Sequence, residues 1–169
     1  SLYDNNRSIR NYELIESYEK IDFSDFKSIK FDYKYPTPFT FNFVDVNEIM
    51  EMNPDDYPDI SDLIIEIQNW DRSTSSDSLG AGIFAIFYYN LGKYIKKPYI
   101  NRNLSKNLIA QMLRDVKAYM VKHFNKTNVK LGEYQKLVRG DKEIPIWGMP
   151  DVITAMTSSR HMGLSLIHI

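Results

Sequence analysis

One segment of the sequence, residues 79–94, is apolar on nearly every side of the helix that it predicts. It reads LGAGIFAIFYYNLGKY. A helix at the surface of a protein carries its apolar residues on one stripe, so a helix that is apolar all round must be enclosed by other elements. Asp77 or Ser78 can cap its first turn. Gly80 and Gly82 disfavour the interior of a helix, which indicates that another part of the chain approaches the backbone closely there.

Two short helices are predicted near the start of the chain. Residues 8–19 place apolar side chains at three-residue steps, which puts them along one side of a helix. Asp22, followed three residues later by Asp25, resembles a capping box with aspartate in place of glutamate. A second helix is therefore predicted over about 23–31.

The middle of the chain predicts an extended connector and two more helices. Residues 33–43 hold two prolines among five aromatic side chains, so they cannot continue a helix and should lie extended over a core. Asp59 or Ser61 can cap a helix that runs through Trp70. A serine also caps a further amphipathic helix over about 105–124.

The sequence pattern changes after Asn125, where glycines and prolines interrupt the apolar periodicity typical of helices. The short runs at 134–138 and 152–156 read as strands or turns. The fold class predicted from these patterns is α+β, locally mainly α-helical, with short strands after about residue 130. No internal repeat is present, so we expect one compact unit.

Composition excludes several classes of function. With 21 Lys and Arg against 22 Asp and Glu the formal net charge is −1, which removes any bulk electrostatic attraction to nucleic acid or to an anionic membrane. No stretch approaches the roughly 18 apolar residues of a membrane span, and residues 1–7 lack the pattern of a signal peptide. The absence of cysteine excludes disulfides, thiolate metal sites and a cysteine nucleophile. We therefore expect neither nucleic-acid nor membrane partners.

Generic catalytic and metal-binding motifs are absent from the sequence. There is no phosphate-binding glycine loop, no nucleophile elbow and no zinc-binding spacing among His123, His161 and His168. His123, at the end of a predicted helix, is expected to interact with the last carbonyl groups. The acidic pair 55–56 follows a proline and reads as a solvated turn. No cofactor or metal site is predicted within the 169 residues.

A long and unusual run, LVRGDKEIPIWGMPDVITAM, occupies the later part of the chain, and three shorter pieces precede it. In chain order the four pieces are NNRSIR at 5–10, FSDFKSIK at 23–30, NWDR at 69–72 with DS at 77–78, and the long run at 137–156. In these pieces and in their order the chain resembles the penicillin acylase family of N-terminal nucleophile amidohydrolases, which includes acyl-homoserine lactone acylases. The resemblance spans about residues 3–158.

This resemblance implies an αββα fold and a self-cleaved precursor. The serine exposed by cleavage supplies the attacking hydroxyl, and its own α-amine acts as the base. An asparagine side chain and a backbone amide stabilise the oxyanion. The implied substrates are small N-acylated amides, including acyl-homoserine lactones and the side chains of β-lactams. Calcium in the full-length parent and a periplasmic or secreted location are further implications of the resemblance alone.

The resemblance places the attacking group outside this sequence. Ser1 is not assigned as the nucleophile, because residues 2–4 read LYD where the family has asparagine and, soon after, tryptophan. The nucleophile, the oxyanion asparagine and the calcium ligands are expected before residue 1, so the missing N-terminal part of the same precursor is a predicted partner. Arg7 matches the family's active-site arginine, with Arg10 as the alternative one helical turn later.

Other polar residues in these motifs are given structural roles. Asn5 and Asn6 have the character of helix-cap residues. Arg139, Asp141 and Asp151 belong to the long run, where we expect hydrogen bonds that stabilise turns.

The boundaries follow from the same resemblance. Residues 1–163 are interpreted as a C-terminal-half segment of an acylase β-chain, an incomplete domain that we expect to be inactive by itself. Residues 164–169 match the translation of a transposon adapter end used in sequencing libraries, with a terminal strand as the alternative. The alternative function is a stand-alone helical interaction module without catalysis, whose aromatic segment 33–43 packs on a partner.

Overall fold

The computed structural model describes residues 5–41, 44–94 and 102–153. Over these residues the chain is mainly helical, as the sequence predicted. The helices are α1 (Asn6–Glu16), α2 (Phe23–Lys30), α3 (Ser61–Gln68), α4 (Leu79–Tyr94), α5 (Lys106–Phe124) and α6 (Leu131–Tyr134), with 3-10 turns at Asn47–Glu51 and Pro54–Asp56. The expectations for Ser1, His161, His168, residues 154–163 and residues 164–169 lie outside the described residues.

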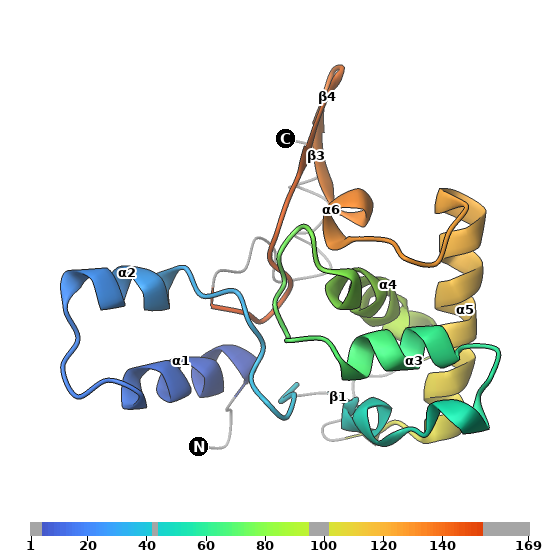
Figure 1. Cartoon of the computed structure of the whole chain (residues 1–169), viewed down its shortest axis with the longest axis horizontal. Coiled ribbons are helices and arrows are strands. Elements are labelled where there is room, and N and C mark those ends of the chain that lie inside the picture. The colour runs from blue at the N-terminus through green and yellow to red at the C-terminus, as the bar shows by residue number, and fades with distance from the viewer. Residues whose placement is uncertain (1–4, 42–43, 95–101, 154–169) are drawn as a thin grey trace.

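Strands are short and occur in two pairs. β1 (Val44–Asp45) pairs in parallel with β2 (Arg102–Asn103), and β3 (Lys136–Arg139) pairs antiparallel with β4 (Lys142–Pro145). β3 and β4 form a hairpin that extends from the body (Figure 1). Gly140 takes a φ of +59° at its tip, which suits a residue without a side chain. The prediction of short strands after residue 130 is confirmed for this hairpin, whereas Val152 lies in a turn.

Helix α4 is the centre of the body, where it packs against α3, α5 and α6 (Figure 1). Residues 80–87 are buried on every side, including Phe84 and Phe87 at 0% exposure, whereas Tyr89 in the second half of the helix is 44% exposed. Ser78 caps its first turn by accepting a hydrogen bond from the Ala81 amide at 3.1 Å. The prediction of an enclosed helix is therefore confirmed for its first half.

The two glycines of α4 allow close approach, as predicted. A Cβ on Gly80 would lie 2.4 Å from the Cβ of Trp70. A Cβ on Gly82 would lie 2.0 Å from the carbonyl oxygen of Val129. The segment before α6 therefore crosses α4 so closely that the backbones of the two segments are in contact.

The aromatic connector that follows α2 forms part of the core. Tyr35, Phe39 and Phe41 are buried, and the ring of Phe39 stacks on that of Phe84 with centroids 4.8 Å apart. The prediction that the connector lies over a core is confirmed for its described residues. These three side chains are enclosed by the chain itself, so the suggestion that they pack on a partner is wrong.

Helix α3 departs from its prediction at both ends. Its cap position is Ile60, which makes no side-chain cap. Neither predicted cap is used, because the Asp59 carboxylate pairs with Arg114 and the Ser61 hydroxyl donates to the Pro58 carbonyl. The helix also ends before Trp70.

The other helix boundaries lie close to their predictions. Helix α5 begins behind the cap Ser105 as predicted, with Leu108 donating to its hydroxyl at 3.3 Å. The capping box of Asp22 and Asp25 is present at the start of α2. Helix α1 begins two residues earlier than predicted, because Asn5 caps it. No helix among the described residues has both the length and the apolar character needed to span a membrane.

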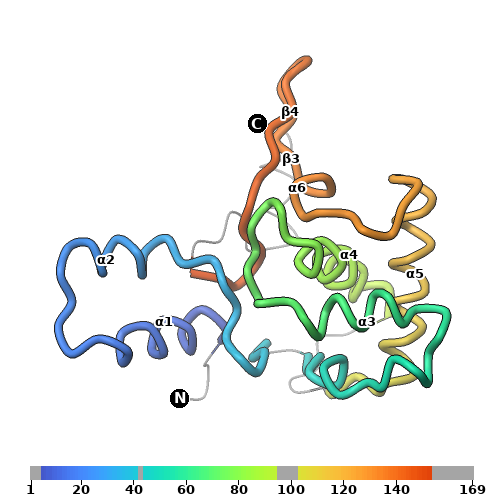
Figure 2. The backbone as a smooth tube through the Cα atoms, viewed as in Figure 1, coloured from blue at the N-terminus to red at the C-terminus, as the bar shows by residue number. Residues whose placement is uncertain are grey.

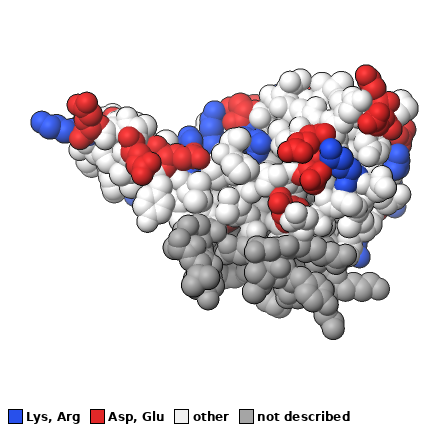
Figure 3. All heavy atoms as spheres, turned by 90° about the horizontal axis from the view of Figure 1, so that it is seen from below, with Lys and Arg blue, Asp and Glu red and all other residues white. Residues whose placement is uncertain are grey.

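Helices α1 and α2 lie together at one side of the body (Figures 1 and 2). We call residues 5–31 the N-terminal arm. Several large apolar side chains of this arm are exposed, including Tyr12 at 61%, Phe23 at 82% and Phe26 at 57%. Acidic and basic side chains occur on both the arm and the body on the face shown in Figure 3, with no large patch of one sign.

Candidate functional site

The arm is joined to the body through the buried side chain of Asn6. Its backbone amide and its Nδ2 both donate to Oδ2 of Asp151 at 3.0 Å. Its Oδ1 accepts from the backbone amide of Thr40 at 2.6 Å. One asparagine therefore connects the start of α1, the aromatic connector and the end of the family-like run, so we take this junction as the candidate site.

Asp151 is half-buried at this junction, with a φ of +68°. Burial raises the pKa of its carboxyl, against the opposing effects of the hydrogen bonds from Asn6 and of the positive charge of Arg7. Burial also raises the pKa values of Tyr35 and Tyr88, and the negative charge of Asp151 adds to both shifts. The tyrosines therefore remain protonated, and Tyr35 donates to the Pro150 carbonyl at 2.7 Å.

The two candidate arginines have different surroundings. Arg7 is exposed, and its Nε donates to the carbonyl of Val152 at 3.0 Å. Arg10 instead donates from Nε and Nη2 to the two oxygens of Asp32, and from Nη1 to Glu13. The carboxylates raise the pKa of Arg10. Arg10 therefore has its donors engaged in ion pairs, whereas Arg7 lies at the junction with an accessible guanidinium.

The expectation of turn-stabilising hydrogen bonds needs a correction at Asp151. Its carboxylate bonds across 145 positions of sequence to Asn6. The backbone at Asp151 is left-handed, with a φ of +68°, and the side chain contacts the start of α1 instead of its own turn. Arg139 and Asp141 lie exposed at the tip of the β3–β4 hairpin. Asn5 caps α1 as expected, whereas Asn6 is a buried junction residue rather than a cap.

The raised pKa of Asp151 predicts a pH-dependent stability. Between the ordinary aspartate pKa of about 3.9 and the raised folded value, the folded chain binds more protons than the unfolded chain. The wild type therefore loses unfolding free energy as the pH rises through the folded pKa. Asp151→Asn cannot titrate, so its stability relative to wild type should improve as the pH rises from the ordinary aspartate pKa through the raised pKa of the folded state. Urea unfolding at each pH measures this, with Asp141→Asn as the exposed control, and parallel curves for wild type and Asp151→Asn would contradict it.

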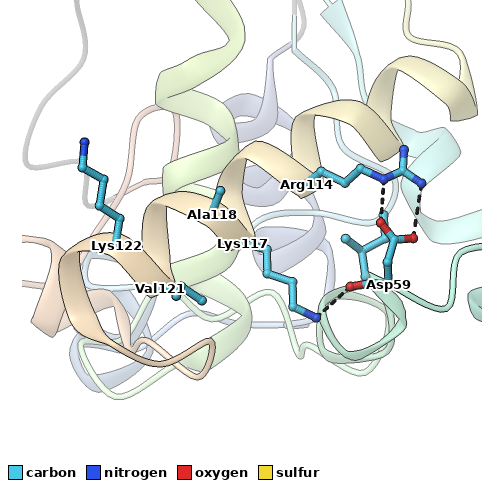
Figure 4. Close-up of a pocket in the computed structure, with 7 residues that line it drawn as sticks. Asp59, Arg114, Lys117, Ala118, Val121 and Lys122 are labelled. Carbon is cyan, nitrogen blue, oxygen red and sulfur yellow. Dashed lines mark hydrogen bonds and ion pairs between the residues drawn. The ribbon is translucent and has the colours of Figure 1, made fainter.

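A second polar cluster lines a shallow hollow between α5 and the start of α3 (Figure 4). Arg114 donates to both carboxylate oxygens of Asp59, at 2.6 and 3.2 Å. Lys117 donates to the Asp59 carbonyl and to Asp62. The Arg114 guanidinium lowers the pKa of Asp59. These charged groups are paired with one another.

The remaining candidates carry no chemistry. His123 lies in the last turn of α5, as expected, with its ring 4.3 Å from that of Tyr119. Asp55 and Asp56 lie in a 3-10 turn, in keeping with the predicted solvated turn. Within the described part of the chain, no group of three or more histidine and acidic residues could hold a metal ion.

Single-sequence reasoning missed two features near this site. The contact of Asn6 with Asp151 joins residues too distant for any pattern in one sequence to pair them. The other is the burial of Arg72, the last residue of the NWDR piece, which is 8% exposed. No local signal distinguishes a buried arginine from a solvated one. No protein-family model matches the chain, and no curated protein matches it either.

Proposed function

We propose that this chain is part of an amidohydrolase of the penicillin acylase type, which cleaves linear amide bonds in small N-acylated substrates. In this proposal the chain belongs to an αββα domain, and the serine nucleophile, the oxyanion asparagine and any calcium ligands lie on sequence that precedes residue 1. The parent is a periplasmic or secreted enzyme matured by self-cleavage. Residues 1–163 supply scaffold and one positive charge, that of Arg7.

The observation that supports this proposal is the meeting of separate family-like pieces. Asn6 and Arg7, from the first piece, bond to Asp151 and Val152, from the last. The Gly148 amide, also in the last piece, donates at 2.9 Å to the carbonyl of Thr74, which lies two residues beyond NWDR. Pieces that resemble one family in order are thus bonded to one another or to residues close to them, which supports the proposal that they serve one site.

The chemistry follows from the resemblance. The serine Oγ attacks the acyl carbon while its proton passes to the α-amine of the same serine. The carbon–nitrogen bond then breaks, and the amine product leaves with that proton. Water hydrolyses the acyl-serine ester to give the carboxylic acid and restore the serine. In this proposal the Arg7 guanidinium stabilises negative charge that develops on the substrate.

The test compares this chain with a longer polypeptide that includes the coding sequence upstream of residue 1. We expect the longer polypeptide to cleave itself, to expose an N-terminal serine detectable by mass spectrometry, and to release p-nitroaniline from N-phenylacetyl-p-nitroanilide. The 169-residue chain alone should release none. Turnover by the short chain that is abolished by changing one of its own side chains would overturn the proposal, as would an upstream sequence with no serine–asparagine start.

One observation favours the alternative of an interaction module. The N-terminal arm exposes the large apolar side chains of Phe23, Phe26 and Tyr12, which a partner protein would cover. In the acylase proposal the rest of the parent covers this arm. A monodisperse, cooperatively melting monomer of residues 1–163, together with an inactive longer polypeptide, would favour the module instead.

A further inference from the structure

Arg72 occupies an unusual place in the turn that follows α3. Its φ is +64°, a left-handed backbone that is unfavourable for a residue with a side chain. Neighbouring bonds hold this conformation, because the Arg72 carbonyl accepts from the Tyr35 amide at 3.1 Å. The Trp70 indole also donates to the Ser73 carbonyl at 2.8 Å, and the Ser73 amide donates to Asp71 at 2.9 Å. The turn is therefore rigid and directs the Arg72 side chain inward.

Among the described residues, the buried guanidinium of Arg72 has no counter-charge. The residue is 8% exposed, and its Nη1 is the buried side-chain nitrogen left without a hydrogen-bond partner among the described residues. None of the ion pairs in the described part of the chain includes it. The group instead lies over the ring of Phe39, with Cζ 3.8 Å from the ring centroid.

Two other arginines of this chain each form an ion pair with a carboxylate. Arg10 pairs through two nitrogens with Asp32, and Arg114 does the same with Asp59. Both of these pairs are more exposed than Arg72. The free energy lost when a cation is removed from water is larger than the free energy gained from contact with one aromatic ring. Consistent with this, burial lowers the pKa of Arg72.

We propose that Arg72 binds a small carboxylate monoanion. A planar carboxylate matches the fork of guanidinium nitrogens and would satisfy Nη1. One cation balances one negative charge, which favours a carboxylate over a phosphate dianion. The turn that carries Arg72 borders solvent, because the side chain of the preceding Asp71 is 60% exposed. This inference does not depend on the proposed amidohydrolase activity.

The test uses acetate as the probe and the 169-residue chain as it stands. Acetate should raise the melting temperature of the wild type in a saturable way, beyond sodium chloride at the same ionic strength. Arg72→Met should lose this effect, and Arg72→Lys, which keeps the charge but not the fork, should bind acetate about tenfold more weakly. Arg139→Met, at the exposed hairpin tip, should respond like the wild type.

A second measurement keeps the proposal testable if Arg72→Met does not fold. In the wild type, acetate should shift the arginine Nε–H signal of Arg72 in a nitrogen–proton NMR spectrum, with the signal assigned through Arg72→Lys. Equal responses to acetate and chloride in the wild type would overturn the proposal. A response to acetate that survives in Arg72→Met would overturn it equally.

Discussion

Gly82→Ala should destabilise the chain by about 3 kcal/mol, the upper part of the range for overpacking in a protein core. The new Cβ would lie 2.0 Å from the carbonyl oxygen of Val129 and 3.1 Å from the amide nitrogen of Leu131. Both contacts are to backbone, which cannot rotate away as a side chain can. The same segment is held to α4 by a hydrogen bond of 3.0 Å from the Leu131 amide to the Ser78 carbonyl. Urea unfolding followed by circular dichroism measures the loss.

The sign of the stability change in Gly82→Ala distinguishes the effect of packing from that of helix propensity. In a free helix, alanine is more favourable than glycine by about 1 kcal/mol, so propensity alone would stabilise the variant. Gly140→Ala is the matched control, because its Cβ would meet nothing within 4 Å and only its φ of +59° is strained. We expect that control to lose about 1 kcal/mol. A Gly82→Ala variant as stable as the wild type would show that residues 129–131 do not cross α4 at this distance.

Arg7→Ala should lower kcat/KM for amide hydrolysis about a hundredfold in the longer, self-cleaved polypeptide. Arg7 is exposed at the junction, where its Nε bonds to the Val152 carbonyl, so its loss removes positive charge from the proposed site. Release of p-nitroaniline from N-phenylacetyl-p-nitroanilide under initial-rate conditions gives the ratio.

Arg10 and Arg139 supply the comparison for this variant. Arg10→Ala breaks the ion pair with Asp32 and should reduce stability while leaving kcat/KM within a few fold. Arg139→Ala, at the hairpin tip, should change neither quantity. If the rate instead falls in Arg10→Ala and not in Arg7→Ala, the supporting charge belongs to Arg10, and the assignment of Arg7 fails.

The helices with strong local signals could be predicted from the sequence. Helix α4 begins where Ser78 caps it, and α5 begins behind Ser105, because a side-chain oxygen at the cap acts on amides two or three residues away. The cap of α3 was mispredicted for a non-local reason. Asp59 pairs with Arg114, 55 positions later, and a distant partner of this kind leaves no trace in the residues around Asp59.

The candidate site was less predictable than the helices. The motifs of the site could be recognised in the sequence, but the hydrogen bonds that join these motifs depend on the tertiary fold. The left-handed backbone at Asp151 and at Arg72 is an example. A glycine in a sequence often indicates a left-handed conformation, whereas an aspartate or an arginine does not predict one. Burial of the Arg72 guanidinium likewise follows from where Phe39 packs, which no helix or strand pattern encodes.

The bonds from Asn6 and Arg7 to Asp151 and Val152 also bear on the order of events during biosynthesis. Because they join residues 145 positions apart, α1 leaves the ribosome long before its acceptors exist. The entropic free energy of closing a loop rises by only about 0.6 kcal/mol for each doubling of loop length, so these distant bonds destabilise the folded chain little more than shorter-range bonds would. Distant contacts are nevertheless slow to find. Helix α1 is thus among the last of the described helices to dock, and its Tyr12 and Ile15, which are exposed even in the folded chain, stay in contact with the surrounding solution throughout that interval.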